Sequence, residues 1–169
     1  DKSMAEQSKI LDTVKAKLIQ ANTATTSADG RESIRKDITK LLEQLDNIAQ
    51  QTNYNGNYLL QLDATSGAGA TASLEFQVGE KTSDMITMDA VRANTTGLAL
   101  TGLTGLTTSG TLTTTAAQTG QGSVDSAITT LNGYRGDIGS TQNQVESAVR
   151  NLMTQATNIK NAESVIRDV

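Results

Sequence analysis

The chain has 169 residues and a formal net charge of −4 at pH 7, and only 2% of its residues are aromatic. This length suits one domain with at most a small insertion, and the acidic balance excludes the basic footprint of a nucleic-acid or anionic-lipid binder. Cys and His are both absent, which removes thiolate sites, disulfides and the commonest general base. We therefore expect no enzyme, no metal site and no cofactor.

The first predicted element is a helix over residues 1–22. Its apolar stripe consists of Met4, Leu11, Val14, Leu18 and Ala21. After a polar loop over residues 23–28, a second helix is predicted to begin at Asp29, with Asp29 as its cap and Glu32 at the capping-box spacing. The expected buried face of this second helix is Ile34, Ile38, Leu41, Leu42, Leu45 and Ile48. An Asn55-Gly56 turn follows, and Tyr58, Leu59 and Leu60 return apolar groups to the core of a helical hairpin over residues 1–63.

Strict alternation then predicts a β-hairpin over residues 72–92. Leu74, Phe76 and Val78 share one face of the first strand, and Ile86 and Met88 alternate again after a connection. A lone hairpin is not stable in water, so we expect it to lie on the helices.

Residues 93–122 are rich in Thr, Gly, Ala and Leu and hold too little bulky apolar surface for a second core. We predict a surface connection between the hairpin and the last helix. Its Thr residues could accept O-linked sugars, although a plain polar loop is the simpler interpretation.

The chain ends in a predicted helix over residues 123–169, with Ser123 as its N-cap. One face of it carries Val124, Ile128, Leu131, Tyr134, Ile138, Val145, Val149, Leu152, Ala156, Ile159, Ala162 and Ile166. Such a helix cannot bury its stripe against itself and needs long helical partners in this chain or in other subunits. The predicted fold is mainly α with a small β part: one domain over residues 1–169, built as an elongated antiparallel bundle of long helices with a packed β-hairpin.

Several segments resemble bacterial flagellin, in the order in which that family has them. They are Leu11–Asn22, Ile34–Leu45, Gln51–Leu60, Phe76–Gly79 and Tyr134–Val169, and the phrases LDTVKAK and LDNIAQQTNYNG lean toward the epsilon-proteobacterial branch. The Asn55-Gly56 turn followed by Phe-Gln-Val-Gly is the most specific pairing. The resemblance implies the inner rod (D1-like) domain of a structural subunit of the extracellular flagellar filament, which serves motility.

The same resemblance implies partners. In the family these are other flagellin subunits, which form a homopolymer, together with an export chaperone and the filament cap. The terminal polymerisation segments of the family are missing here, so we expect this chain to be monomeric. The large outer domains of many flagellins are replaced by the Thr-rich connection.

One family site can be compared residue by residue. Enteric flagellins carry an innate immune receptor contact whose positions correspond to Leu11, Asp12, Thr13, Val14, Lys15, Ala16, Lys17 and Asp37. Thr13 stands where the family has its key Arg, and Ala16 and Lys17 stand where it has Glu and Leu. Loss of an Arg guanidinium group and of an apolar side chain from the centre of an interface typically weakens the binding free energy by several kcal/mol. We therefore expect weak receptor binding.

Three alternatives remain from sequence. A hook–filament junction protein shares the terminal helices, although the Asn-Gly and Phe-Gln-Val-Gly segments favour flagellin over it. A secreted helical module that recognises a host receptor belongs to a different class. A hydrolase is least supported, because no Ser, Thr or Lys stands in a nucleophile arrangement and the SGAGAT stretch lacks the Lys-Ser/Thr of a phosphate loop.

Overall fold

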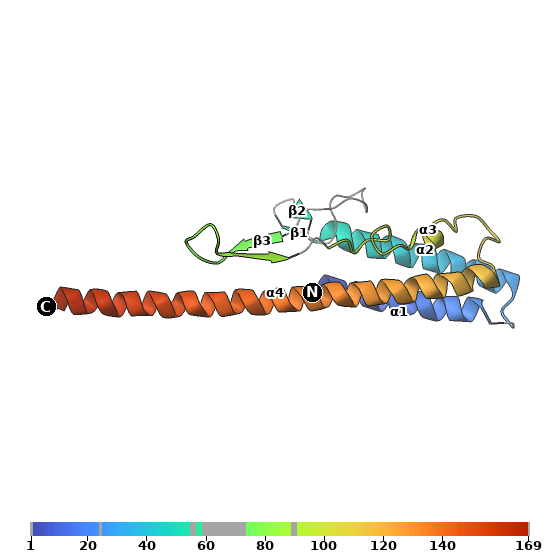
Figure 1. The fold of residues 1–169 in the computed structure, drawn as a ribbon. Helices are drawn as coiled ribbons and strands as arrows, with labels where there is room; N and C mark the ends of the chain where they lie inside the picture. Colours follow the sequence, from blue (N-terminus) through green and yellow to red (C-terminus); the bar gives the residue numbers. More distant parts are fainter. Residues whose placement is uncertain (1, 24, 55–56, 59–73, 89–90, 169) are drawn as a thin grey trace. The chain divides into compact units, whose positions relative to one another are not determined.

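Figure 1 shows the computed structural model, which describes residues 2–23, 25–54, 57–58, 74–88 and 91–168. The helices are α1 (Lys2–Ala21), α2 (Ala28–Gln51), α3 (Thr101–Thr104) and α4 (Thr114–Asp168). The strands are β1 (Asn53–Tyr54), β2 (Asn57–Tyr58), β3 (Leu74–Gln77) and β4 (Met85–Met88). The mainly helical class with a small β part is confirmed. The chain forms two compact units, Asp1–Ala72 with Ala90–Arg135, and Ser73–Asp89 with Gly136–Val169.

In the first unit, α1 and α2 form an antiparallel pair beside the first part of α4 (Figure 1). All the predicted stripe residues of α1 are buried, and so are most of those of α2, while Leu41 and Ile48 are half-buried. Val124, Ala127 and Leu131 of α4 are also buried. Aliphatic side chains therefore make this core, as the low aromatic content predicts.

The predicted cap of α2 is wrong. The helix begins at Ala28, and Ser27 is its N-cap, because the Ser27 hydroxyl accepts a hydrogen bond of 3.0 Å from the Gly30 backbone N–H. Ser27 has the extended backbone that a cap requires, whereas Asp29 already lies in the first turn. Glu32 does not reach back to a cap and instead pairs with Arg35.

Two antiparallel strand pairs follow. β1 pairs with β2 in the register Asn53↔Tyr58, and the predicted Asn55-Gly56 turn between them, like Leu59 and Leu60, lies outside the described residues. β3 pairs with β4 in the register Leu74↔Met88, which confirms the predicted hairpin. Within the second unit, Ile86 of β4 lines a shallow hollow with Asn143, Gln144, Ser147, Ala148 and Asn151 of α4. The hairpin thus lies on a helix, as expected.

The prediction of a surface connection over residues 93–122 is wrong in two respects. Its leucines Leu98, Leu100, Leu103 and Leu112 are buried, so the segment contributes to the core of the first unit. Its last part is helical, because α4 begins at Thr114. The cap is Thr113, whose hydroxyl accepts a bond of 3.1 Å from the Ala116 N–H, while Ser123 lies inside the helix and donates to the Thr119 carbonyl.

The segment begins with a tight turn, which is hydrogen-bonded to α2. The Asp46 carboxylate accepts hydrogen bonds from the Thr95 N–H at 2.7 Å and from the Thr95 hydroxyl at 2.8 Å. Gly97 passes so close to the chain behind it that a Cβ there would lie 2.3 Å from the Arg92 carbonyl oxygen. Only glycine fits this approach without a shift of the backbone.

Small residues also decide how α4 packs. Gly120 is buried, and a Cβ at this position would lie 2.7 Å from Leu103 Cδ2 and 3.2 Å from Leu18 Cδ1. By contrast, Gly133, Gly136 and Gly139 have open space around them. The boundary between the two units, after Arg135, falls within this run of glycines in α4.

Candidate assembly surface

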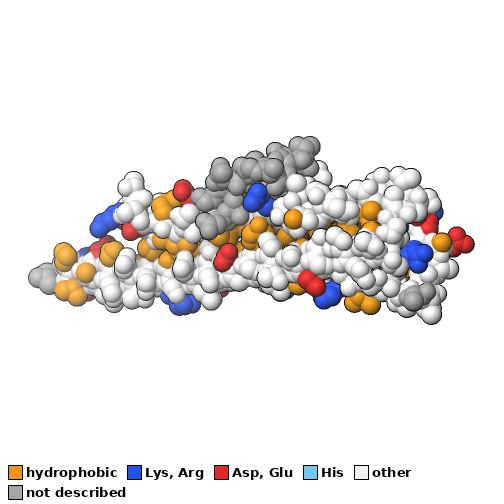
Figure 2. Space-filling model, turned by 45° about the vertical axis from the view of Figure 1, so that its right-hand side comes forward, with side chains coloured by type: hydrophobic (Ala, Val, Ile, Leu, Met, Phe, Trp, Pro, Cys, Tyr) orange, Lys and Arg blue, Asp and Glu red, His pale blue; other side chains and the backbone are white. Residues whose placement is uncertain are grey.

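The C-terminal part of α4 carries apolar side chains that the rest of the described chain leaves exposed. The predicted stripe is buried at Val124 and Leu131 and half-buried at Ile128, Tyr134, Ile138 and Val145. Further along, the exposed fraction is 47% for Val149, 41% for Leu152, 68% for Ile159 and 78% for Ile166. Figure 2 shows hydrophobic side chains on this part of the surface.

These exposed residues share one face of the helix. At 100° per residue, Val149, Leu152, Ala156, Ile159 and Ile166 fall within an arc of about 100°. Met153, 65% exposed, lies at its edge, and Val165 lies on the other side of α4. We call the face formed by Val149, Leu152, Ala156, Ile159 and Ile166 the apolar face.

Thr154 and Thr157 lie away from the apolar face, and their hydroxyls bond to their own helix. The hydroxyl of Thr154 donates to the Arg150 carbonyl at 3.1 Å, and that of Thr157 donates to the Met153 carbonyl at 3.0 Å. Glu163 falls within the arc of the apolar face and Arg167 at its margin; the two approach to 3.9 Å while both stay largely in solvent, so their pairing is weak. Burial of a large aliphatic side chain contributes about 1.5–3 kcal/mol, and the apolar face therefore favours a cover, most simply another helix.

The predicted receptor-contact positions lie on α1 and α2 in the first unit, and the structure divides them by burial. Leu11 and Val14 are buried and belong to the core. Asp12, Thr13 and Ala16 are exposed. Thr13 presents a hydroxyl that donates to its own helix, at the Lys9 carbonyl.

The two lysines of this set form ion pairs. Lys17 Nζ lies 3.2 Å from Asp37 Oδ2, so two of these positions pair with each other within the chain. Lys15 Nζ lies 2.6 Å from Asp125 Oδ1 and is engaged with α4. The set presents no guanidinium group.

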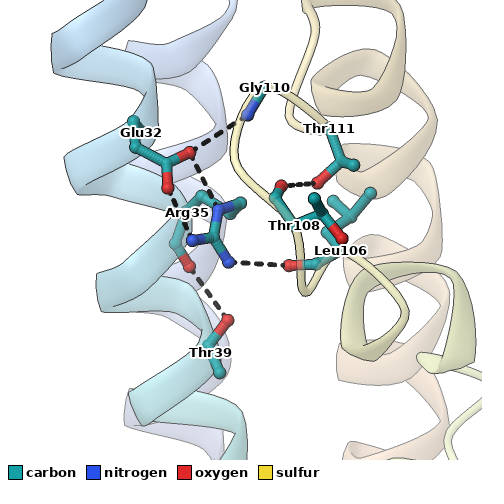
Figure 3. A network of polar contacts seen from close by, with 7 residues as sticks. All are labelled: Glu32, Arg35, Thr39, Leu106, Thr108, Gly110 and Thr111. Atoms are coloured by element: carbon teal, nitrogen blue, oxygen red, sulfur yellow. Dashed lines mark hydrogen bonds and ion pairs between the residues drawn. The ribbon is translucent and has the colours of Figure 1, made fainter.

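A polar cluster that sequence reasoning missed lies between α2 and the segment before α4 (Figure 3). Arg35 donates to both carboxylate oxygens of Glu32, from Nε at 2.9 Å and from Nη2 at 2.6 Å. Arg35 Nη1 also donates to the Leu106 carbonyl at 3.1 Å, and Glu32 accepts from the Gly110 N–H at 3.3 Å. We call this arrangement the Glu32–Arg35 clamp.

The clamp is well shielded, with 10% of the Arg35 side chain and 20% of the Glu32 side chain exposed. The hydrogen bonds from Arg35 lower the pKa of Glu32 to about 2, although partial desolvation opposes the shift. Opposite charges three residues apart are a visible sequence signal. The backbone partners at positions 106 and 110 are not, because nothing in the sequence indicates which carbonyl a distant loop presents.

Other kinds of site find little support in the described residues. Among them, no three His, Cys, Asp or Glu side chains come close enough to hold a metal ion. Within the same ranges, no helix combines the length and the apolar character that crossing a membrane requires. The described residues define a long-helix protein: in the first unit α1 and α2 lie beside the start of α4, and in the second unit a β-hairpin and an exposed apolar helix face accompany the rest of α4.

The comparisons identify the family. Residues 1–65 match the bacterial flagellin N-terminal helical region, and residues 121–169 match the bacterial flagellin C-terminal helical region. The chain belongs to the bacterial flagellin family. The resemblance seen in the sequence is thereby confirmed.

Individual relatives agree. Flagellin A of Helicobacter mustelae is 43% identical over 100 residues, which cover 56% of this chain and 20% of that protein. The flagellar filament 30.7 kDa core protein of Treponema maltophilum is 25% identical over 167 residues, 98% of this chain and 59% of that protein. The crystal structure of Bacillus cereus flagellin is similar with a TM-score of 0.71 and 28% identity, over 96% of this chain and 86% of that one. The chain spans about a fifth of the length of the Helicobacter relative.

Proposed function

We propose that this chain is the rod part of a structural subunit of the extracellular flagellar filament, and that it works by lengthwise packing rather than by catalysis. The observation that carries the proposal is the apolar face of α4, which stays exposed at Val149, Leu152, Ile159 and Ile166 in a chain of flagellin type. A face of this kind is typical of a helix that completes its packing against further helices. In a filament those helices come from the same subunit and its neighbours.

The two ends of α4 have different roles in this proposal. The first part, with Val124 and Leu131 buried, supports the fold of the single subunit. The last part carries the apolar face and supports assembly. Substitutions in the two parts should therefore separate stability from assembly.

The test uses chains extended at both ends with the terminal segments of the Helicobacter mustelae relative. Ile159→Lys with Ile166→Lys replaces two apolar side chains of the apolar face by charged ones, which are unfavourable to bury. Thr154→Lys with Asn161→Lys is the matched control, because these exposed residues lie on the opposite side of α4. We expect filaments in electron micrographs from the unchanged and control chains and none from the Ile159 and Ile166 variant.

Other products would contradict the proposal. Short rings that do not elongate would favour a hook–filament junction protein. Binding of the 169-residue chain to host cells, without any assembly of the extended chain, would favour a secreted recognition module. If both lysine variants formed filaments equally well, the apolar face would not be part of the assembly surface.

We also propose that the chain binds the innate immune receptor of the family weakly. Support comes from Thr13 in place of the family's Arg and from Lys17, which pairs with Asp37 and stands where the family has an apolar anchor. Biosensor measurements with the purified chain should show no nanomolar binding, and restoring the Arg, Glu and Leu at positions 13, 16 and 17 should strengthen it. An export chaperone and the filament cap complete the proposed partners, and co-purification with the extended chain would test both.

A further inference from the structure

Residues 104–111 cross the first unit between two buried anchors, Leu103 and Leu112, each 3% exposed. Between these anchors every residue is exposed or half-buried. Backbone hydrogen bonds in this stretch are local, as from the Leu106 N–H to the Leu103 carbonyl and from the Thr111 N–H to the Thr108 carbonyl. We call residues 104–111 the strap.

Two hollows border the strap, one at Leu106 and one at Gly110. A hollow of about 320 Å³ is lined by Leu103, Leu106, Ala116 and Gly120, among others. A second hollow of about 230 Å³ is lined by Arg31, Glu32, Gly110 and Leu112, among others. Thr113, the cap of α4, lines both hollows. Few apolar contacts would therefore be lost if the strap moved away from α2.

The polar contacts of the strap to α2 come from the Glu32–Arg35 clamp. Within the described residues, these are the bond from Arg35 to the Leu106 carbonyl and the bond from the Gly110 N–H to Glu32. Gly110 has a positive φ of 81°, which is uncommon for other residues and aims its N–H at Glu32 (Figure 3). The strap itself has no charged residue, so the ionic part of the clamp belongs to α2 alone.

We propose that the strap is a latched segment, which opens and closes as a unit independently of the helices, with the Glu32–Arg35 clamp as its latch. Closed, it partitions the two hollows. Open, it carries Leu106 away from Leu103, Ala116 and Gly120, which line the first hollow with it. Charge-assisted hydrogen bonds to a loop with little packing are the main term that holds such a segment, because local opening costs only the contacts that are broken. The proposal concerns the single subunit and does not depend on filament assembly.

Hydrogen exchange of the 169-residue chain, read by mass spectrometry, tests the latch. Glu32→Gln weakens the carboxylate side of the clamp, and Arg35→Met removes the bond to Leu106 while keeping an apolar stem. Glu43→Gln is the matched control, an exposed acid on the same helix. Each clamp variant should raise exchange in peptides covering residues 104–111 by about tenfold or more and leave α1, the rest of α2 and α4 within about twofold of the unchanged chain.

Each of the other outcomes overturns the proposal. Equal loss of protection in the helices would make the clamp part of the general core rather than a latch. No change in the strap in either variant, or full exposure of the strap already in the unchanged chain, would mean that the clamp does not hold it. Opening of different peptides by Glu32→Gln and Arg35→Met would show that the two residues do not act on one segment.

Discussion

Lys15 Nζ of α1 lies 2.6 Å from Asp125 Oδ1 of α4, and this ion pair ties the first and last helices of the chain together. Both side chains are partly solvated, with 40% of Lys15 and 54% of Asp125 exposed. Solvent and salt therefore screen much of the attraction.

A double-mutant cycle with Lys15→Met and Asp125→Asn should give a coupling of about 0.2–1 kcal/mol in the free energy of unfolding. The coupling should shrink in 1 M salt, where the screening length falls to about 3 Å. Asp12→Asn, an exposed acid on the same helix as Lys15, serves as the control. A coupling that is insensitive to salt would contradict this account of a screened pair.

The side-chain amide of Gln7 links α1 to α2 and to the segment that follows the β3–β4 hairpin. Its side chain is fully buried, and its Nε2 donates to the Leu45 carbonyl at 3.2 Å and to the Ala93 carbonyl at 2.7 Å. Gln7→Met keeps the length but leaves both carbonyls without this donor. We expect a loss of about 1–3 kcal/mol in the free energy of unfolding, measured by urea denaturation. Gln20→Met, at an exposed position of the same helix, should change it by less than about 0.5 kcal/mol.

Gly97 should not tolerate a side chain. In Gly97→Ala the new methyl group would meet the Arg92 carbonyl, a backbone atom that cannot rotate away. Thermal unfolding should therefore show a loss of about 2 kcal/mol or more. Gly102→Ala in α3 has nothing within 4 Å of the new Cβ and should be neutral or stabilising. Equal stability of the two variants would mean that the turn relaxes around residue 97.

Glu32 should give the chain a pH dependence in the acid range. Its pKa in the folded chain is about 2, against an ordinary value of 4.5, so the folded state favours the charged carboxylate. The stabilisation is fully present above pH 4.5 and is lost as the pH falls through about 2. Side-chain NMR should place the Glu32 titration near the lower value. Stability measured between pH 4.5 and 2 should fall less steeply in Glu32→Gln than in the unchanged chain.

The sequence was a good guide wherever aliphatic side chains repeat at helical spacing. The stripe of α1 was predicted residue by residue because its apolar positions are regular and its charges stay off the face. The β3–β4 hairpin was equally visible from alternation. In both cases the local pattern and the tertiary burial agree.

The sequence was a poor guide where tertiary contacts outweigh composition. The start of α4 is rich in Thr and Gly, which have low helix propensity, so it was predicted as loop. In the structure Ala117 and Gly120 are buried, and Leu103 packs where a larger residue at position 120 would collide. The clamp was missed for a similar reason, since Glu32 and Arg35 gain their partners from a loop more than 70 positions away.

Gly133, Gly136 and Gly139 give α4 an uneven stiffness. Each glycine costs up to about 1 kcal/mol of helix stability relative to alanine, and Ser140 adjoins the last of them in a Gly-Ser pair of the kind at which helices bend. We therefore expect bending of this helix to concentrate in these turns rather than in the flanking ones. If the chain serves in a filament as proposed, this run of glycines is where its longest helix would bend first under torque.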